Sequence, residues 1–229
     1  MHDSFPAEGS HLQRYAARFC GVEINSSFHR PHSHATYARW AAGVPEHFRF
    51  CVKLPKTVTH EHGLVDCAGL LDAFLAQAAG LGPRLSCLLV QLPPKLDFDA
   101  TTARAFFALL RERWPGDVAV EPRHASWFAP EAEAMLTAAR AARVLADPVL
   151  HPTGERPGGW PAMAYLRLHG SPRRYYSSYE PQTIAALARR IRRALGDNQE
   201  VWCIFDNTAS GAAAHNALLL KQCLEKDPA

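Results

Sequence analysis

Seven short segments of the chain alternate apolar and polar residues with a period of two, the pattern of strands with two different faces. In the stretch GDVAVEPRHASW, Val118 and Val120 alternate with Ala119 and Glu121. Each segment turns polar where it ends, as parallel strands wrapped by helices do at their carboxyl ends. The pattern predicts strands in the segments 22–28, 48–55, 86–94, 116–127, 143–148, 163–170 and 201–208.

Between these segments the apolar residues recur at helical spacing. Residues that favour helix starts precede most of these stretches. One connection differs, because 151–161 contains three prolines and three glycines and is predicted to be a loop. The expected helix starts are Ser10, Ser33, Asp66, Asp99 or Thr101, Pro130, Pro181 and Ser210.

Alternating strands and helices predict an α/β fold, either a TIM-type (β/α) barrel or a doubly wound sheet. A doubly wound sheet usually carries a glycine-rich first turn, and the chain has neither G-x-G-x-x-G nor a Walker A motif. Polar residues end every predicted strand, which favours the barrel. We expect one barrel domain over residues 1–229, with seven strands and the first barrel strand missing.

Composition agrees with one compact domain, since 229 residues with 48% hydrophobic and 21% charged residues can bury a large core. The net charge of +3 gives little support for a nucleic-acid partner. Six cysteines without C-x-x-C spacing indicate reduced, buried thiols and a cytoplasmic protein. No apolar run approaches the roughly 18 residues of a membrane span, so we expect no membrane partner.

The polar strand ends supply the groups needed for general acid/base catalysis. We expect Glu121 or His169 to act as the base, with His124 and Lys53 as further catalytic groups. Arg123 would favour the Glu121 carboxylate while burial opposes it, so Glu121 could exchange protons near neutral pH. A small polar or anionic ligand is the expected partner.

The remaining polar residues at the strand ends are candidates for substrate binding. Arg123 and Arg167, with Lys53, would form an anion site. Asn25 and Gln91 could orient substrate hydroxyls, and Tyr176 lies in a loop able to stack on a sugar or base. The full set is Glu23, Asn25, Gln91, Arg123, Asp147, Arg167, Tyr176, Asp206 and Asn207.

Two alternatives to acid/base catalysis stay open. The first is a metal-dependent hydrolase or phosphodiesterase-like barrel, although neither HRPHSH (29–34) nor THEHG (59–63) has H-E-x-x-H spacing. We assign no metal ligands and no cofactor, and interpret these histidines as ordinary loop residues. The second is a non-catalytic barrel that binds a metabolite or a nucleic-acid end.

Six ordered segments resemble the YecE-like family, catalogued as domain of unknown function 72. They are VEINSSFHRP, FRFCVKLPKTVTHE, LLVQLPP, EPRHASWF, YLRLHGSPRRYYSSY and FDNTASGAAAHNAL. The resemblance covers nearly the whole chain and implies a TIM-type barrel, but the family has no settled activity.

The chain departs from the family pattern at two points. Members typically begin with a strand that ends in a Gly-Thr-Ser-Gly-Trp-like segment, and nothing before Ser10 matches it. His29 stands where the family often has tyrosine. We therefore expect Met1 to be an internal start or truncation of a longer family-type chain, which would be less stable and more prone to associate than the longer form.

Overall fold

A computed structural model describes residues 5–197 and 199–226 of the chain. The protein has a mixed α/β fold in which most strand pairs are parallel. It divides into two compact units, 1–127 with 139–141 and 128–138 with 142–229. Each of the seven segments predicted to be extended contains a strand.

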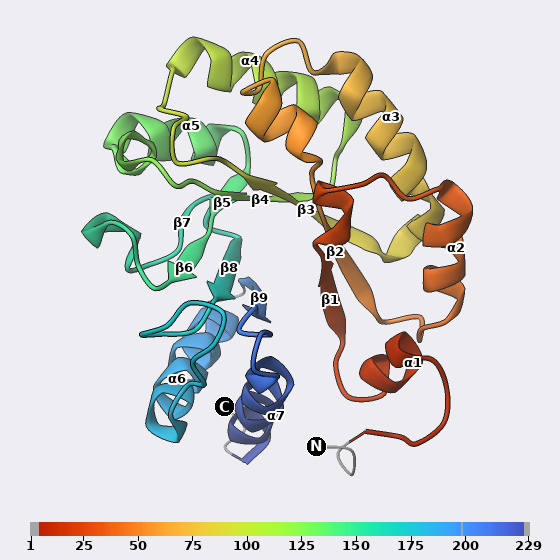
Figure 1. Cartoon of the computed structure of the whole chain (residues 1–229). Coiled ribbons are helices and arrows are strands. Elements are labelled where there is room, and N and C mark those ends of the chain that lie inside the picture. Colours follow the sequence, from red (N-terminus) through yellow and green to blue (C-terminus); the bar gives the residue numbers. More distant parts are fainter. Residues whose placement is uncertain (1–4, 198, 227–229) are drawn as a thin grey trace. The chain divides into compact units, whose positions relative to one another are not determined.

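The first unit contains four parallel strands in sequence order (Figure 1). Their parallel order brings all four carboxyl ends to one edge of the sheet. Helices connect them, and the larger helices lie along one face of the sheet (Figure 1). The strands are β1 (Gly21–Ile24), β2 (Arg49–Lys53), β3 (Leu85–Gln91) and β4 (Asp117–Glu121), and the helices are α1 (His11–Ala16), α2 (His34–Ala42), α3 (Ala68–Ala78) and α4 (Ala100–Arg113).

Three of the predicted helix caps are confirmed. The side chains of Ser10, Ser33 and Asp99 each accept a hydrogen bond from the backbone N–H three residues later. The prediction for Asp66 is wrong, because Cys67 occupies the N-cap position of α3 and makes no side-chain cap. Asp66 instead adopts a left-handed backbone conformation, with φ of 51°, in the turn before the helix.

Short helices follow several strands. A π-helix, η3 (Thr57–Glu61), comes soon after β2. Such turns are rare in proteins, and those that occur are often found at functional sites. The other short helices are η2 (Ser26–Phe28), η4 (Ala79–Arg84), η5 (Ala125–Phe128) and η6 (Pro152–Gly154).

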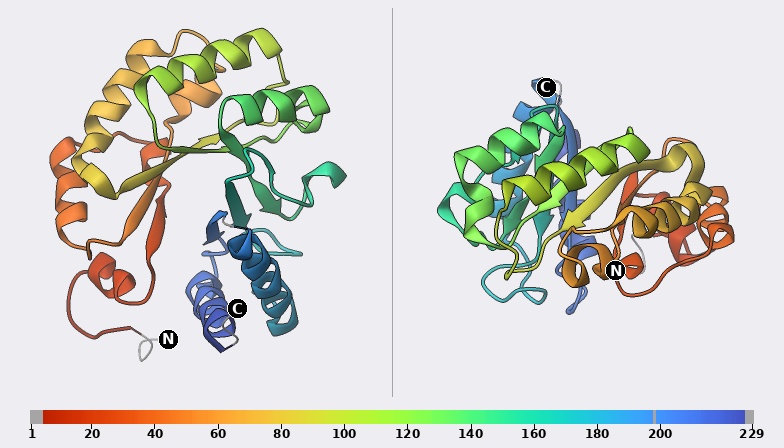
Figure 2. Two further views of the ribbon diagram at one scale, coloured as in Figure 1. Left: turned by 180° about the vertical axis from the view of Figure 1, so that it is seen from behind. Right: turned by 90° about the horizontal axis from the view of Figure 1, so that it is seen from above.

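The second unit contains a parallel sheet in the order β6-β8-β9 and a short antiparallel pair of β5 with β7. Helices α6 and α7 lie side by side and both contact β9 (Figure 2). Its elements are α5 (Pro130–Ala138), β5 (Ala141–Arg143), β6 (Leu145–Asp147), β7 (Gly158–Gly159), β8 (Met163–Leu168), α6 (Pro181–Gly196), β9 (Glu200–Phe205) and α7 (Ala212–Lys226).

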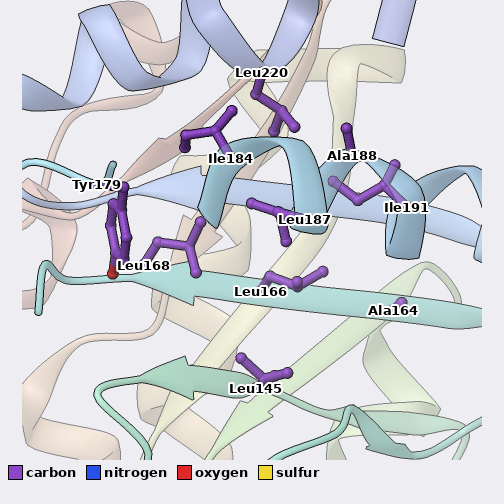
Figure 3. Close-up of a cluster of buried hydrophobic side chains, with 10 residues drawn as sticks. All are labelled: Leu145, Ala164, Leu166, Leu168, Tyr179, Ile184, Leu187, Ala188, Ile191 and Leu220. Atoms are coloured by element: carbon purple, nitrogen blue, oxygen red, sulfur yellow. The ribbon is translucent and has the colours of Figure 1, made fainter. Parts of the chain in front are cut away.

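The core of the second unit packs β8 against α6 and α7 (Figure 3). Leu166 and Leu168 of β8 lie beneath Ile184 and Leu187 of α6. Burying each such side chain contributes roughly 1.5–3 kcal/mol, so this contact fixes β8 and the polar residues that follow it. The cluster consists of Leu145, Ala164, Leu166, Leu168, Tyr179, Ile184, Leu187, Ala188, Ile191 and Leu220.

The second unit differs from the predicted element pattern at three places. The segment 143–148 is shared between two three-residue strands, β5 and β6, and α5 ends at Ala138, before the expected end of its helical pattern. The predicted loop 151–161 contains the two-residue strand β7. Helix α7 begins at Ala212, and the hydroxyl of Ser210 donates a hydrogen bond to the carbonyl of Tyr176, at 2.5 Å.

Across the residues that the structure describes, the strands form open sheets, so the mixed α/β class is observed without a closed barrel. No helix of the described part is long and apolar enough to cross a bilayer. All six cysteines are free thiols. Cys51, Cys67 and Cys87 are buried as expected, whereas Cys20 is exposed.

Candidate functional site

The first unit places four predicted site residues on the four strands of its sheet. Glu23 lies in β1, and Lys53, Gln91 and Glu121 are the last residues of β2, β3 and β4. Gln91 pairs in register with Glu121, so these two side chains come from neighbouring positions on adjacent strands. The expectation that polar groups gather at one end of the sheet is met in this unit.

Glu121 and Arg123 form a buried ion pair. The Nη2 of Arg123 lies 2.5 Å from the Oε1 of Glu121, whose residue is 0% exposed. A charged hydrogen bond of this kind offsets the high cost of removing both ions from water. The predicted proximity of the two side chains is therefore confirmed, and Arg123 orients the carboxylate.

Glu23 and Asn25 also form a pair. The Nδ2 of Asn25 donates to the Oε1 of Glu23 over 2.7 Å, and Glu23 is buried. The pair spans the end of β1, where the chain turns into η2. The amide of Asn25 thus holds the Glu23 carboxylate in one orientation.

Lys53 contacts an aromatic ring at the end of β2. Its Nζ lies 4.0 Å from the centroid of the Phe28 ring, close enough for a cation–π interaction. The ring of His60 approaches Phe28 edge-on, with 4.8 Å between centroids, and its Nδ1 is hydrogen-bonded to the Thr59 hydroxyl at 2.8 Å. Lys53 and His60 therefore share one ring.

Burial lowers the pKa of His60, and the positive charges of three residues lower it further. Those charges come from Lys53, Lys95 and Arg123. Sequence analysis missed Phe28 and Lys95 and interpreted His60 as an ordinary loop histidine. The available signal was position: Phe28 ends the predicted strand segment 22–28, and Lys95 directly follows the segment 86–94.

His124 has a local role at the end of β4. Its Nδ1 is hydrogen-bonded to the Ser126 hydroxyl at 2.8 Å, and Ser126 Oγ accepts a bond from the backbone N–H of Phe98. These contacts link the segment after β4 to the segment before α4. They fix the backbone beside Arg123.

In the second unit, Asp206 accepts hydrogen bonds from two predicted site residues. The Nδ1 of His169 lies 3.1 Å from Asp206 Oδ2, and the Nη2 of Arg167 lies 3.2 Å from the same oxygen. His169 is 0% and Arg167 2% exposed, whereas the Asp206 side chain is 22% exposed. The three residues come from the carboxyl ends of β8 and β9, which pair in parallel.

Asp147 is held by a neighbouring tyrosine. The hydroxyl of Tyr179 donates to Asp147 Oδ2 over 2.6 Å and accepts a bond from the backbone N–H of Gly170 at 2.9 Å. Burial, together with the bond to Asp147, raises the pKa of Tyr179 far above its ordinary value. Tyr179 therefore stays a neutral donor to the carboxylate.

The turn after β8 is tightly packed. Gly170 has φ of 93°, and a Cβ there would lie 2.8 Å from the carbonyl oxygen of Ser177. Glycine is therefore the residue that fits this position. The ring of Tyr175 packs edge-on against His169.

Asn207 is buried beside this turn. Its Nδ2 donates to the carbonyl of Ser177 and to the Oδ1 of Asn216, at 2.9 and 2.8 Å. Its Oδ1 is buried and accepts no hydrogen bond from the described residues. The side chain thus ties the loop to α7 and leaves one acceptor oxygen.

Tyr176 is the most exposed of the predicted site residues in the second unit, at 47%. The guanidinium of Arg173 stacks on its ring, 3.9 Å from the centroid. That the exposed Tyr176 ring contacts a substrate remains a prediction.

The described residues hold no group of three or more His, Cys, Asp or Glu side chains that could bind a metal ion. Two of the three histidines of HRPHSH contact aromatic rings. His29 packs on Phe28, and His32 packs on Tyr37 and Trp40. Glu121 and His169 lie in different units, so their joint role in proton transfer stays a prediction.

Two curated relatives are similar to different lengths of the chain. UPF0759 protein YecE of Escherichia coli K12 is 32% identical over 120 residues, 52% of this chain and 43% of that protein. The match thus spans less than half the length of that relative. UPF0759 protein YunF of Bacillus subtilis 168 is 26% identical in an alignment of 264 residues, which covers 98% of this chain and 90% of that protein.

Solved structures agree with the fold. A DUF72 family protein from Enterococcus faecalis V583 has a TM-score of 0.82 at 24% identity, covering 98% of this chain and 92% of that chain. Another, from Thermotoga maritima MSB8, has a TM-score of 0.77 at 28% identity, covering 96% and 92%. The model of the family described as protein of unknown function DUF72 matches residues 3–229, and the chain belongs to this family.

Proposed function

We propose that this protein is an enzyme that uses general acid/base chemistry on a small polar or anionic substrate, with His169 as the proton carrier. The observation that carries the proposal is the hydrogen bond from the buried imidazole of His169 to Asp206. A carboxylate that fixes one imidazole nitrogen is a recurring arrangement in enzymes that move protons through histidine.

The geometry gives each member of this cluster a role. Because a carboxylate only accepts hydrogen bonds, the proton of the neutral imidazole lies on Nδ1, and Nε2 carries the lone pair. When Nε2 takes a proton from the substrate, the Asp206 carboxylate stabilises the imidazolium that forms. Arg167 is a positioning residue, since its guanidinium binds the same oxygen of Asp206.

Other residues of the second unit support the same chemistry. Asp147, held by Tyr179, is a candidate for binding substrate hydroxyls, and the buried Oδ1 of Asn207 is an acceptor without a donor among the described residues. The exposed ring of Tyr176 could stack on a substrate.

The first unit supplies the remaining candidates. Glu121 stays a candidate base, with Lys53 and His124 as further candidate catalytic groups. The candidate substrate contacts in this unit are Glu23, Asn25, Gln91 and Arg123. We also propose that residues 1–229 form one domain and that its fold is a TIM-type barrel. The open parallel strands of both units and the similar solved structures are compatible with these proposals.

A screen with a matched control tests the proposal. Wild-type protein, His169→Asn and His215→Asn are incubated with a mixture of small phosphorylated and carboxylated metabolites, and conversion is followed by mass spectrometry. His215 is an exposed histidine in the same unit, so its replacement makes the same chemical change away from the cluster.

We expect conversion by wild type and His215→Asn, and a loss of about 10²–10⁴-fold in His169→Asn at unchanged melting temperature. Equal conversion by a stable His169→Asn variant would remove the basis of the proposal. No conversion by wild type, together with tight binding of a metabolite, would favour a non-catalytic protein.

A further inference from the structure

The first unit gathers basic side chains around the Phe28 ring, outside the His169 cluster. The Nζ of Lys53 lies 4.0 Å from the ring centroid, and the His60 ring lies 4.8 Å from it at an interplanar angle of 81°. Lys53 ends β2, and His60 follows on the π-helix η3. Two consecutive segments thus present a cation and an imidazole to one ring.

Two further cations act on the same imidazole. Lys95 follows β3, Arg123 follows β4, and both add to the effect of Lys53 on His60. Strands β2, β3 and β4 pair in parallel in that order, so Lys53, Lys95 and Arg123 come from the same end of the sheet. The carboxyl ends of β2, β3 and β4 therefore bring three cations to the end of the sheet where η3 follows β2.

Acidic groups on the same elements have partners of their own. Glu121 binds Arg123 at 2.5 Å, Glu61 of the π-helix binds Lys56 at 2.9 Å, and Glu23 accepts a bond from Asn25. The ring of another histidine, His29, also contacts Phe28, with 4.9 Å between the ring centroids. Burial is the largest cause of the lowered pKa of His60, and the charges of Lys53, Lys95 and Arg123 lower it further.

We propose that Lys53, His60, Lys95 and Arg123 bind a divalent oxyanion, the phosphate or sulfate group of a small molecule, with Phe28 as the apolar wall. Several cations held close together repel one another, and a bound dianion relieves that repulsion. Ammonium and guanidinium groups bind such oxyanions through charged hydrogen bonds. Lys53 is buried, so its ammonium would meet the anion with little competing water.

The hydrogen bond to Thr59 gives His60 a defined part in the site. If Nδ1 accepts the Thr59 hydroxyl, the neutral ring carries its proton on Nε2 and can donate it to the anion. A bound dianion also offsets the three cations and favours the imidazolium, so binding takes up a proton. Affinity should therefore rise as the pH falls.

This inference goes beyond the proposed function: Lys53 and Arg123 are also candidate site residues there, but the binding of an oxyanion requires no turnover. Sulfate is the suitable probe, since it stays divalent across the pH range in which histidine titrates. Its affinity is measured by titration calorimetry at about pH 8 and about pH 5.5, within the range where histidine changes charge. A positive result leaves the role of His169 open, and a negative one does not affect it.

Matched variants separate the site from general electrostatics. Lys53→Met removes a buried charge at the end of β2, and Lys56→Met removes a 46% exposed charge three residues later, at the start of η3. His60→Gln has His47→Gln as its control, because His47 is exposed and precedes β2. Lys95→Met, at an exposed position, provides a second test if Lys53→Met fails to fold.

We expect sulfate to bind wild type several-fold more tightly at the lower pH. Lys53→Met or Lys95→Met should weaken binding about tenfold, and His60→Gln should abolish the pH dependence, whereas both controls stay within about twofold. Equal weakening by Lys53→Met and Lys56→Met would overturn the proposal, as would folded wild type that binds no sulfate. A pH dependence that survives in His60→Gln would overturn the part assigned to His60.

Discussion

Asp206 joins two donors that precede it by 37 and 39 positions in the sequence, His169 and Arg167. Residue types and strand-end positions made all three of them candidate site residues, and the structure brings the three side chains into contact. Residue types and positions could not predict which oxygen each donor binds, because that depends on the pairing of β8 with β9. At the residue scale, sequence identifies the chemistry and the sheet register decides the partners.

The hydroxyl of Tyr179 is expected to stabilise the fold through its two hydrogen bonds. In Tyr179→Phe the buried N–H of Gly170 and the carboxylate of Asp147 both lose a partner. We expect the free energy of unfolding to fall by about 1–3 kcal/mol, measured by urea denaturation. Tyr176→Phe, at an exposed ring, should stay within about 0.5 kcal/mol. Equal stability of the two variants would contradict the assigned role of Tyr179.

Two tyrosines and two cysteines that are fully or partly buried give the protein a predictable response to alkaline pH. Burial raises the pKa of Tyr15 and Tyr37 to about 12, of Cys67 to about 11 and of Cys203 to about 12, from ordinary values of 10.0 and 9.0. Each raised pKa contributes stability that is present below the unfolded value and is lost as the pH rises towards the folded one.

The free energy of unfolding should therefore fall progressively above about pH 9 and continue to fall to about pH 12. Urea unfolding at a series of pH values measures this loss. Replacement of Tyr37 by phenylalanine, which keeps the ring and removes the ionisable group, should make the decline shallower above about pH 10. A free energy of unfolding that stays constant over this range would show that the buried groups do not control it.

At the scale of elements, alternation predicted all seven long strand segments and capping residues predicted most helix starts. The features that the pattern did not predict correctly are short elements or a turn with a strained backbone. β5 and β7 have three and two residues, too few for a period-two pattern, and Asp66 has a left-handed backbone instead of capping α3. The π-helix η3 was missed because its sequence, TVTHE, carries no periodic signal of its own.

The cap of α2 provides a test at this scale. Ser33→Ala removes the side chain that accepts from the N–H of Thr36, and we expect a loss of about 1 kcal/mol in urea denaturation. Ser33→Asp keeps an acceptor at the same position and should stay within about 0.5 kcal/mol of wild type. If aspartate is as destabilising as alanine, the hydroxyl of Ser33 does not act as a cap.

At the scale of the whole molecule, the family match and similar solved structures cover nearly the full chain, and they agree with the α/β class predicted from the strand pattern. The proposed single domain over 1–229 makes a thermodynamic prediction. Scanning calorimetry should show one transition whose calorimetric and van't Hoff enthalpies agree. Two resolved transitions would contradict the single domain.

The central claim is that His169 and Asp206 move a proton as one unit, and a double-mutant cycle on the turnover of a converted metabolite tests it most directly. Residues that act as a unit lose activity non-additively. We predict that His169→Asn and Asp206→Asn each lower turnover by at least about 10²-fold. The turnover of the double variant should be no lower than that of the less active single variant. Losses that multiply in the double variant, or full turnover in either folded single variant, would contradict the account.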